Sequence, residues 1–211
     1  ANTTGACNIG IGHSALVANT TGADNTVIGT AAMSTNTTGQ DNVAMGKSAL
    51  LLNTEGASNA ALGISSLCNN TTGTCNTAVG HSALNKNTTA SCNTAVGSRS
   101  LYSTTSGEDN TAVGNYALCK NTTGECNTAV GVMALQLNTT AECNVAVGMH
   151  AMCKSTTACR NTAVGAFASF TATTGHQNTA IGQGALYAMT DGGNNAALGR
   201  NAGASVTTGN N

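Results

Sequence analysis

Nine cysteines are the residues of this chain with the clearest chemical potential, and six of them are spaced as pairs. The two members of each pair lie six or seven residues apart, on either side of an Asn-Thr-Thr or Ser-Thr-Thr segment. Thiols that meet across such a corner can form a disulfide that closes a short loop. The sequence therefore predicts three local disulfides: Cys68 with Cys75, Cys119 with Cys126, and Cys153 with Cys159.

The other three cysteines are Cys7, Cys92 and Cys143, and two of them allow a different pairing. Cys92 follows Cys75 by 17 residues, and Cys143 follows Cys126 by the same interval. If that interval is a structural repeat, these thiols stack at a distance that a disulfide can bridge, so ladder pairing stays open. Nine cysteines in so small a chain favour an oxidising compartment, which predicts an extracellular, cell-surface or virion-surface location.

Other reactive side chains form no recognisable site. None of the four histidines accompanies the cysteines at a spacing typical of zinc ligands. No Ser/His/acid set or carboxylate pair recurs along the chain. We therefore expect no catalytic residue, no metal and no cofactor, and a protein that is not an enzyme.

Charge excludes two classes of partner. Seven Lys and Arg residues face eight Asp and Glu residues, and charged residues make up only 7% of the chain. A basic surface for nucleic acid or anionic lipid is therefore absent. No apolar run approaches the ~18 residues of a membrane span, so we expect no membrane insertion.

A strict internal repeat organises the whole sequence. Glycine recurs every 17 residues, twelve times, without insertion or deletion. We number each repeat so that this glycine is position 17, and we call the same position in successive repeats a column. The column contains Gly12, Gly29, Gly46, Gly63, Gly80, Gly97, Gly114, Gly131, Gly148, Gly165, Gly182 and Gly199.

The repeat is too small to fold alone. Position 13 is always Asn, position 8 is always Thr, position 16 is always apolar, and position 4 is Leu or Met in ten of twelve repeats. Such units bury their apolar residues only by stacking on copies of themselves. The β-branched Asn-Thr-Ala-Val stretch before each glycine favours strands over helices. We predict one all-β domain over residues 1–211, a parallel β-solenoid of twelve 17-residue turns about 58 Å long.

Two columns carry predictions about side-chain direction. We expect the Asn at position 13 to form an internal hydrogen-bonded ladder, represented by Asn76, Asn93, Asn110 and Asn127. Side chains alternate along a strand, so if Val at position 16 points inward, Ala at position 15 points outward. The sequence then predicts a smooth alanine stripe that packs against another copy of the chain.

Position 7 forms Asn-x-Thr sequons, which are glycosylation acceptors in secreted proteins. A row of glycans along one edge is one interpretation, and a turn Asn without modification is the other. The candidate residues are Asn2, Asn19, Asn36, Asn70, Asn87, Asn121 and Asn138.

The repeat resembles a known family of surface proteins. The unit Asn76-Thr77-Ala78-Val79-Gly80, followed by Ala83-Leu84, is similar to the head repeats of trimeric autotransporter adhesins and to repeats in bacteriophage tail fibres. The resemblance implies a left-handed parallel β-roll that trimerises into a rod. It also implies an adhesive or fibrous role without catalysis. The family unit is typically shorter and poorer in cysteine.

We therefore expect a structural or adhesive fibre subunit whose main partner is itself, through lateral packing, end-to-end stacking or both. A host surface or glycan is a further candidate partner, recognised by the variable columns. The alternative is an ice-binding solenoid, because threonine recurs in columns 8, 9 and 14. Columns 8 and 9 are adjacent and column 14 shares a face with apolar column 16, so a flat two-column threonine array is not expected. The repeat also starts without a distinct capping turn, which suggests end-to-end assembly.

Overall fold

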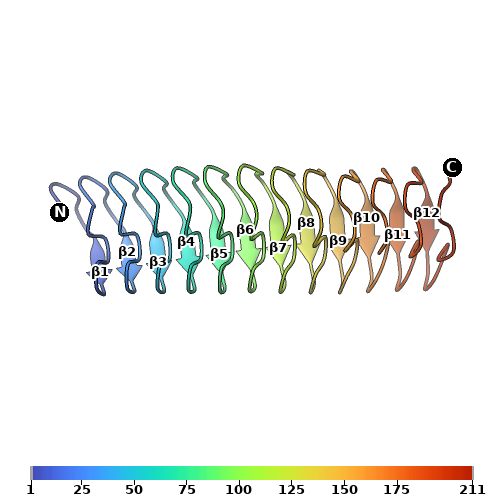
Figure 1. Cartoon of the computed structure of the whole chain (residues 1–211), viewed down its shortest axis with the longest axis horizontal. Helices are drawn as coiled ribbons and strands as arrows, with labels where there is room; N and C mark the ends of the chain where they lie inside the picture. The colour runs from blue at the N-terminus through green and yellow to red at the C-terminus, as the bar shows by residue number, and fades with distance from the viewer. Residues whose placement is uncertain (1, 211) are drawn as a thin grey trace.

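The chain folds into a straight rod built from one parallel sheet, in a computed structural model that describes residues 2–210 (Figure 1). Twelve strands of three residues follow one another in chain order across the sheet. They are β1 (Ile9–Ile11), β2 (Thr26–Ile28), β3 (Val43–Met45), β4 (Ala60–Leu62), β5 (Thr77–Val79), β6 (Thr94–Val96), β7 (Thr111–Val113), β8 (Thr128–Val130), β9 (Val145–Val147), β10 (Thr162–Val164), β11 (Thr179–Ile181) and β12 (Ala196–Leu198).

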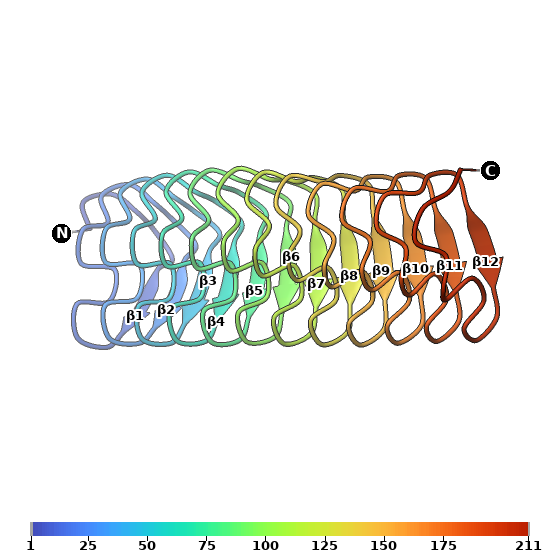
Figure 2. The ribbon, with the colours of Figure 1, turned by 45° about the vertical axis from the view of Figure 1, so that its right-hand side comes forward.

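Each strand pairs with its neighbours in a register of 17 residues. Thr111, for example, lies opposite Thr128, and Val113 lies opposite Val130. The remainder of each turn returns through several corners to the start of the next strand. Figure 2 shows the turns stacked along the rod as loops of similar outline. No helix occurs within the described residues. The predicted all-β, parallel β-solenoid is confirmed.

The glycine at position 17 is required by both conformation and space. Along this column φ ranges from +122° to +143°, a region that side chains rarely adopt. A Cβ added at Gly80 would lie 2.7 Å from the carbonyl carbon of Gly97 in the next turn. The stacked corners therefore exclude any side chain here, which explains the strict 17-residue recurrence.

Three further corners place ordinary residues in the left-handed region. In one turn these are Tyr116, Leu118 and Cys126, at positions 2, 4 and 12, with φ of 56°, 49° and 55°. The same positions have positive φ throughout the rod, although each such residue costs about 1–2 kcal/mol. Position 10 does not have a positive φ in the interior turns. Its glycines and alanines are explained instead by the close approach of the next turn, which leaves little room for a side chain.

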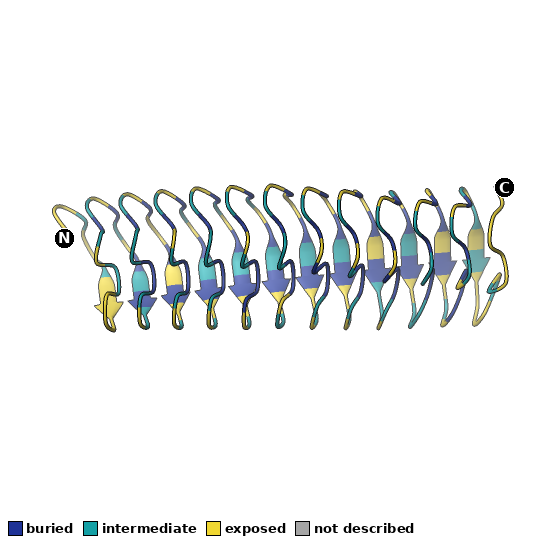
Figure 3. Cartoon of the chain, in the orientation of Figure 1, coloured by how far each residue is buried: buried dark blue, intermediate teal, exposed yellow. Residues whose placement is uncertain are grey.

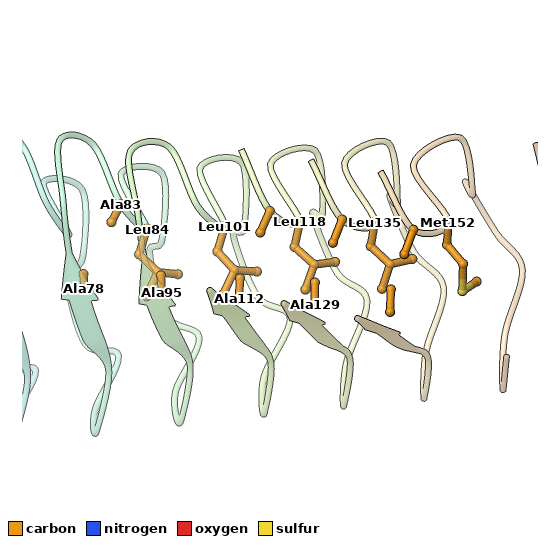
Figure 4. Close-up of a cluster of buried hydrophobic side chains, with 14 of the residues drawn as sticks. Ala78, Ala83, Leu84, Ala95, Leu101, Ala112, Leu118, Ala129, Leu135 and Met152 are labelled. Atoms are coloured by element: carbon orange, nitrogen blue, oxygen red, sulfur yellow. The ribbon is translucent and has the colours of Figure 1, made fainter. Parts of the chain in front are cut away.

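The core is a thin strip of small and branched apolar side chains. Most interior turns contribute an alanine at position 15, an alanine at position 3 and a leucine at position 4, as Ala112, Ala117 and Leu118 do, and Val27 replaces the position-15 alanine in one turn. All three are fully buried. Figure 4 shows the leucines of successive turns extending toward the strand alanines, with Met152 continuing the column. Full burial of each leucine stabilises the fold by roughly 1.5–3 kcal/mol.

The predicted facing of the strands is wrong. Ala112 at position 15 is fully buried, whereas Val113 at position 16 is 37% exposed, and the neighbouring strands repeat this pattern. Figure 3 shows it as a dark central band across the interior strands. The reason is space: the leucine of position 4 fills the narrow interior, so the facing strand residue can be no larger than alanine in most turns. The larger β-branched residues point outward.

The threonine at position 8 has a backbone role that accounts for its invariance. The carbonyl oxygen of Thr37 accepts hydrogen bonds from three successive amides of the preceding turn, those of Thr20, Thr21 and Gly22, at 3.0 to 3.2 Å. The hydroxyl of Thr20 donates to the same oxygen at 2.9 Å. One carbonyl thereby satisfies four donors at a corner that would otherwise leave its amides without partners.

Two substitutions at adjacent residues test the facing of the sheet. Ala112→Asp should lower the free energy of unfolding by several kcal/mol, because it buries an unpaired carboxylate. Val113→Asp should lower it by about 1 kcal/mol or less, because its side chain reaches solvent. Urea denaturation followed by circular dichroism measures both, and an equal loss in the two variants would contradict the assigned facing.

Candidate functional site

The asparagines of position 13 form a continuous ladder along the rod. The side-chain oxygen of Asn93 accepts two hydrogen bonds from Asn110, one from its backbone amide at 3.0 Å and one from Nδ2 at 3.2 Å. Asn110 Nδ2 also donates to the carbonyl of Gly124 at 2.9 Å. Asn76 and Asn127 occupy the same ladder. Aspartate lacks the Nδ2 donors, so asparagine alone suits this column.

Position 7 forms a second ladder that the sequence did not reveal. Asn36 Nδ2 donates to Asn19 Oδ1 at 2.8 Å and to the carbonyl of Gly39 at 2.9 Å. The sequon asparagines are therefore internal, and a glycan on Nδ2 would have to displace this network. Asn2 alone among the candidates is exposed. The fully buried ones are Asn19, Asn36, Asn70, Asn87, Asn121 and Asn138.

The second ladder is broken where position 7 is not asparagine. Thr104 interrupts it after Asn87, and Ser155 interrupts it after Asn138. Buried oxygens lose their partners at both breaks: Oδ1 of Asn87 and Asn138, and the hydroxyl oxygens of Thr104 and Ser155. Each buried polar atom without a hydrogen bond costs about 1–3 kcal/mol.

The predicted local disulfides are absent, since all nine cysteines are free thiols. The contacts of Cys153 and Cys159 show why the sequence misleads. Cys153 Sγ lies 3.6 Å from Oε1 of Gln136, its neighbour in column 5. Cys159 Sγ accepts from the amide of Glu142 at 3.4 Å and donates to the carbonyl of Thr157. The two thiols thus contact different parts of the turn, although six residues separate them.

The thiols of columns 5 and 12 have contrasting surroundings. Cys119 and Cys153 of column 5 are buried and Cys68 is half-buried, and burial raises the pKa of all three thiols. The cysteines of column 12 are exposed, namely Cys7, Cys75, Cys92, Cys126 and Cys143.

The outward side of the sheet is a regular surface along the rod. We define the sheet face as columns 14 and 16, the first and third residues of every strand. Seven residues of column 14 are threonine and all of column 16 is apolar. Neither column contains a charged residue. Val79, Val96, Val113 and Val130 are each 36–37% exposed.

Aromatic residues gather on columns 2 and 5, away from the sheet face. His150 stacks on Phe167 with ring centroids 5.1 Å apart, and Phe170 stacks on Tyr187 at 5.3 Å. Lys154 Nζ lies 4.9 Å from the ring centroid of Phe170. The rings use much of their faces on one another, so this cluster mainly ties successive turns together.

A second set links cations to aromatic rings farther toward the N-terminus. The Arg99 guanidinium lies 5.8 Å from the Tyr102 ring centroid and 5.6 Å from that of Tyr116. It also donates to the Tyr116 hydroxyl at 3.1 Å. The contact with Tyr102 lies within one turn, and the contacts with Tyr116 join that turn to the next.

Metal-binding clusters, membrane spans and hollows were the other candidate features of the described residues. Within residues 2–210 no group of three or more His, Cys, Asp or Glu residues is placed to hold a metal ion. The described chain has no helix long and apolar enough to cross a membrane. A hollow at the last turn is lined by Leu186, Ala197, Gly203 and Val206 among others, and no titratable side chain lines it.

Comparisons of the chain with protein-family models, with curated proteins and with solved structures give no match. The resemblance of the repeat to adhesin heads and tail fibres therefore stays an interpretation of the motif. The argument for function depends on the surfaces of the rod itself.

Restoring the second ladder should stabilise the rod. Thr104→Asn supplies the missing Nδ2 donor to Asn87 Oδ1 and a new Oδ1 acceptor for Asn121. We expect the free energy of unfolding to rise by about 1 kcal/mol. Ser103→Asn, at the neighbouring residue of column 6, is the matched control and should change stability little. A Thr104→Asn variant no more stable than the original chain would show that the break costs nothing.

Proposed function

We propose that this chain is the subunit of a structural fibre, which associates laterally with copies of itself through the sheet face. The observation that carries the proposal is apolar column 16, which follows the rod through all twelve strands and is exposed in ten of them. Monomeric soluble proteins rarely leave a contiguous apolar surface of this length uncovered. A fibre outside the cell, at a cell surface or on a virion is the setting that we infer.

The area of the sheet face is sufficient for a specific contact. The sheet has twelve strands about 4.8 Å apart, and each three-residue strand is about 10 Å long. Its outward side therefore has an area of roughly 600 Å² per copy. Two copies would bury roughly 1,200 Å² in total, at the lower limit of stable protein interfaces. An association of three copies about one axis, as the adhesin resemblance implies, would bury more.

The pattern of the sheet face favours a second copy over an unrelated partner. The surface repeats every turn, so a copy with the same repeat can meet every turn in equivalent contacts. Neither column contains a charge that would be desolvated on contact. The threonines of column 14 supply hydroxyls that can donate and accept across the interface.

The proposal predicts an oligomer that charges on the sheet face disrupt. Sedimentation equilibrium should show a dimer or trimer of the original chain. The double variant Val96→Asp/Val130→Asp should sediment as a monomer, because association would bury two carboxylates on each copy. Circular dichroism should show that the fold is retained, since both residues reach solvent.

The control variant carries its charge elsewhere. Thr123→Asp lies in column 9, where Glu55 and Asp191 occur naturally, and should leave the oligomer intact. A monomeric original chain at micromolar concentration would overturn the proposal of lateral association.

Ice binding is a second candidate, favoured by the same face for a different reason. Columns 14 and 16 both point outward, so the half-buried threonines of column 14 lie beside the exposed apolar residues of column 16 in most strands. A rigid, uncharged grid of this kind can hold an ordered layer of water. Column 14 shares its face with apolar column 16, as expected, but both columns point outward rather than inward.

One pair of measurements separates the two candidates. An ice-binding rod should be monomeric and should produce thermal hysteresis and shaped ice crystals. The Thr111→Lys variant should remove both effects by placing a long charged chain in the grid. A fibre subunit should be oligomeric and should leave ice growth unchanged at the same concentration.

A further inference from the structure

Four of the five exposed thiols lie in two stacked pairs. Cys75 and Cys92 are neighbours in column 12, and so are Cys126 and Cys143. Asp109 occupies the single turn between the pairs. The buried and half-buried thiols of column 5 take no part in this arrangement.

Backbone hydrogen bonds fix the two members of each pair in equivalent positions. The amide of Cys92 donates to the carbonyl of Thr74 at 3.0 Å, one residue before Cys75. The amide of Cys143 donates in the same way to the carbonyl of Glu125 at 3.1 Å. The cysteines share one backbone conformation, with φ of 58° and 60° in the first pair and 55° and 58° in the second.

Equivalent conformations make the Cα–Cβ bonds of each pair parallel. The Cα atoms are then about one turn apart, near 4.8 Å, which lies inside the range that disulfides span. The Cβ atoms are about as far apart, which is slightly more than the ~3.8 Å of a relaxed disulfide. Closure therefore needs a small movement at an exposed corner, and the resulting bond should be readily reduced.

The electrostatic surroundings disfavour ionisation of one thiol in each pair, Cys92 and Cys126. Partial desolvation raises the pKa of Cys92, and the negative charges of Asp109, Cys75 and Glu108 raise it further. Desolvation is also the largest cause of the raised pKa of Cys126. The negative charges of Cys143, Asp109, Glu125 and Glu142 raise this pKa further. The Cys119 thiol, the predicted disulfide partner of Cys126, does not contribute to the shift at Cys126.

We propose that Cys75 with Cys92, and Cys126 with Cys143, are modification sites that a small-molecule disulfide oxidises to disulfides between adjacent turns. The thiolate of one cysteine attacks a sulfur of the small disulfide, forms a mixed disulfide and releases one small thiol. The thiolate of its neighbour then attacks the protein sulfur and releases the second small thiol. Two electrons and two protons pass from the cysteine pair to the small disulfide.

Each new bond would tie one turn covalently to the next. Contacts in a solenoid are made only between neighbouring turns, so loss of structure must spread from turn to turn. Two covalent ties in the middle of the rod would stop that spread on both sides of Asp109. The inference does not depend on which partner covers the sheet face, because column 12 is separate from columns 14 and 16.

Oxidised glutathione is the probe for the test. The reduced protein is incubated with it at several pH values, quenched with an alkylating reagent, and mapped by mass spectrometry without reduction. We expect cross-linked peptides that join Cys75 to Cys92 and Cys126 to Cys143 within one chain. The pKa values of Cys92 and Cys126 are raised, and only a thiolate attacks a disulfide. The rate of cross-link formation should therefore keep increasing at pH values above the ordinary pKa of a cysteine thiol.

Variants identify the pairing independently of stability. Cys75→Ser should leave Cys92 as a persistent mixed disulfide with glutathione, whereas the second pair should still close. Cys68→Ser, the matched control from column 5, should close both pairs as the original chain does. A lasting glutathione adduct on Cys92 of the original chain, cross-links between Cys68 and Cys75, or cross-links only between chains would each overturn the proposal.

Discussion

The stacking of each turn on the next through in-register hydrogen bonds is the constraint on which the rest of this structure depends. A turn has almost no interior of its own, so its backbone groups find partners mainly above and below. Any insertion would shift every later partner, which explains why twelve repeats keep one length. The same constraint excludes a Cβ at position 17, because successive corners lie in contact there.

Hydrogen-bonded asparagine columns stabilise the narrow interior, which has no room for a large hydrophobic core. Each turn buries only two alanines and a leucine in most cases, together with one or two asparagines. An amide offers a donor and an acceptor at one site, so a column of identical amides can satisfy itself along an axis. A column of carboxylates would repel, and a column of leucines would not fit. The unusual composition of the chain is a consequence of this geometry.

Much of the fold could be predicted from the sequence, because a fixed period determines which residues lie above one another. The position-13 ladder could be predicted for the same reason. The facing of the strands could not, since Val113 and Ala112 alternate equally well in either sense. The decision depends on Leu118 and its neighbours, whose positive φ turns the side chain into a space that has little room for a β-branched residue opposite. No sequence pattern marks a leucine as left-handed.

Two columns also imitate known motifs for structural reasons. Asn19 and Thr21 match a sequon, yet an amide ladder fixes the side chain of Asn19 and a corner carbonyl accepts the backbone amide of Thr21. Cys153 and Cys159 are close in sequence, but the corner directs their thiols to different neighbours. In a solenoid, a side chain's nearest neighbour in the same column is one full turn away in the sequence. A short separation along the chain therefore does not show that two side chains are in contact.

The interrupted second ladder has a mechanical consequence. Column 7 is unbroken asparagine from Asn2 to Asn87, resumes only for Asn121 and Asn138, and contains none after that. The second ladder therefore adds side-chain bonds between turns in the N-terminal half that most C-terminal turns lack, whereas the position-13 ladder runs through both halves. A rod pulled along its axis would yield first near its C-terminal turns, while its N-terminal half would carry the load. The aromatic stack from His150 to Tyr187 spans part of that weaker half and acts there as an external brace.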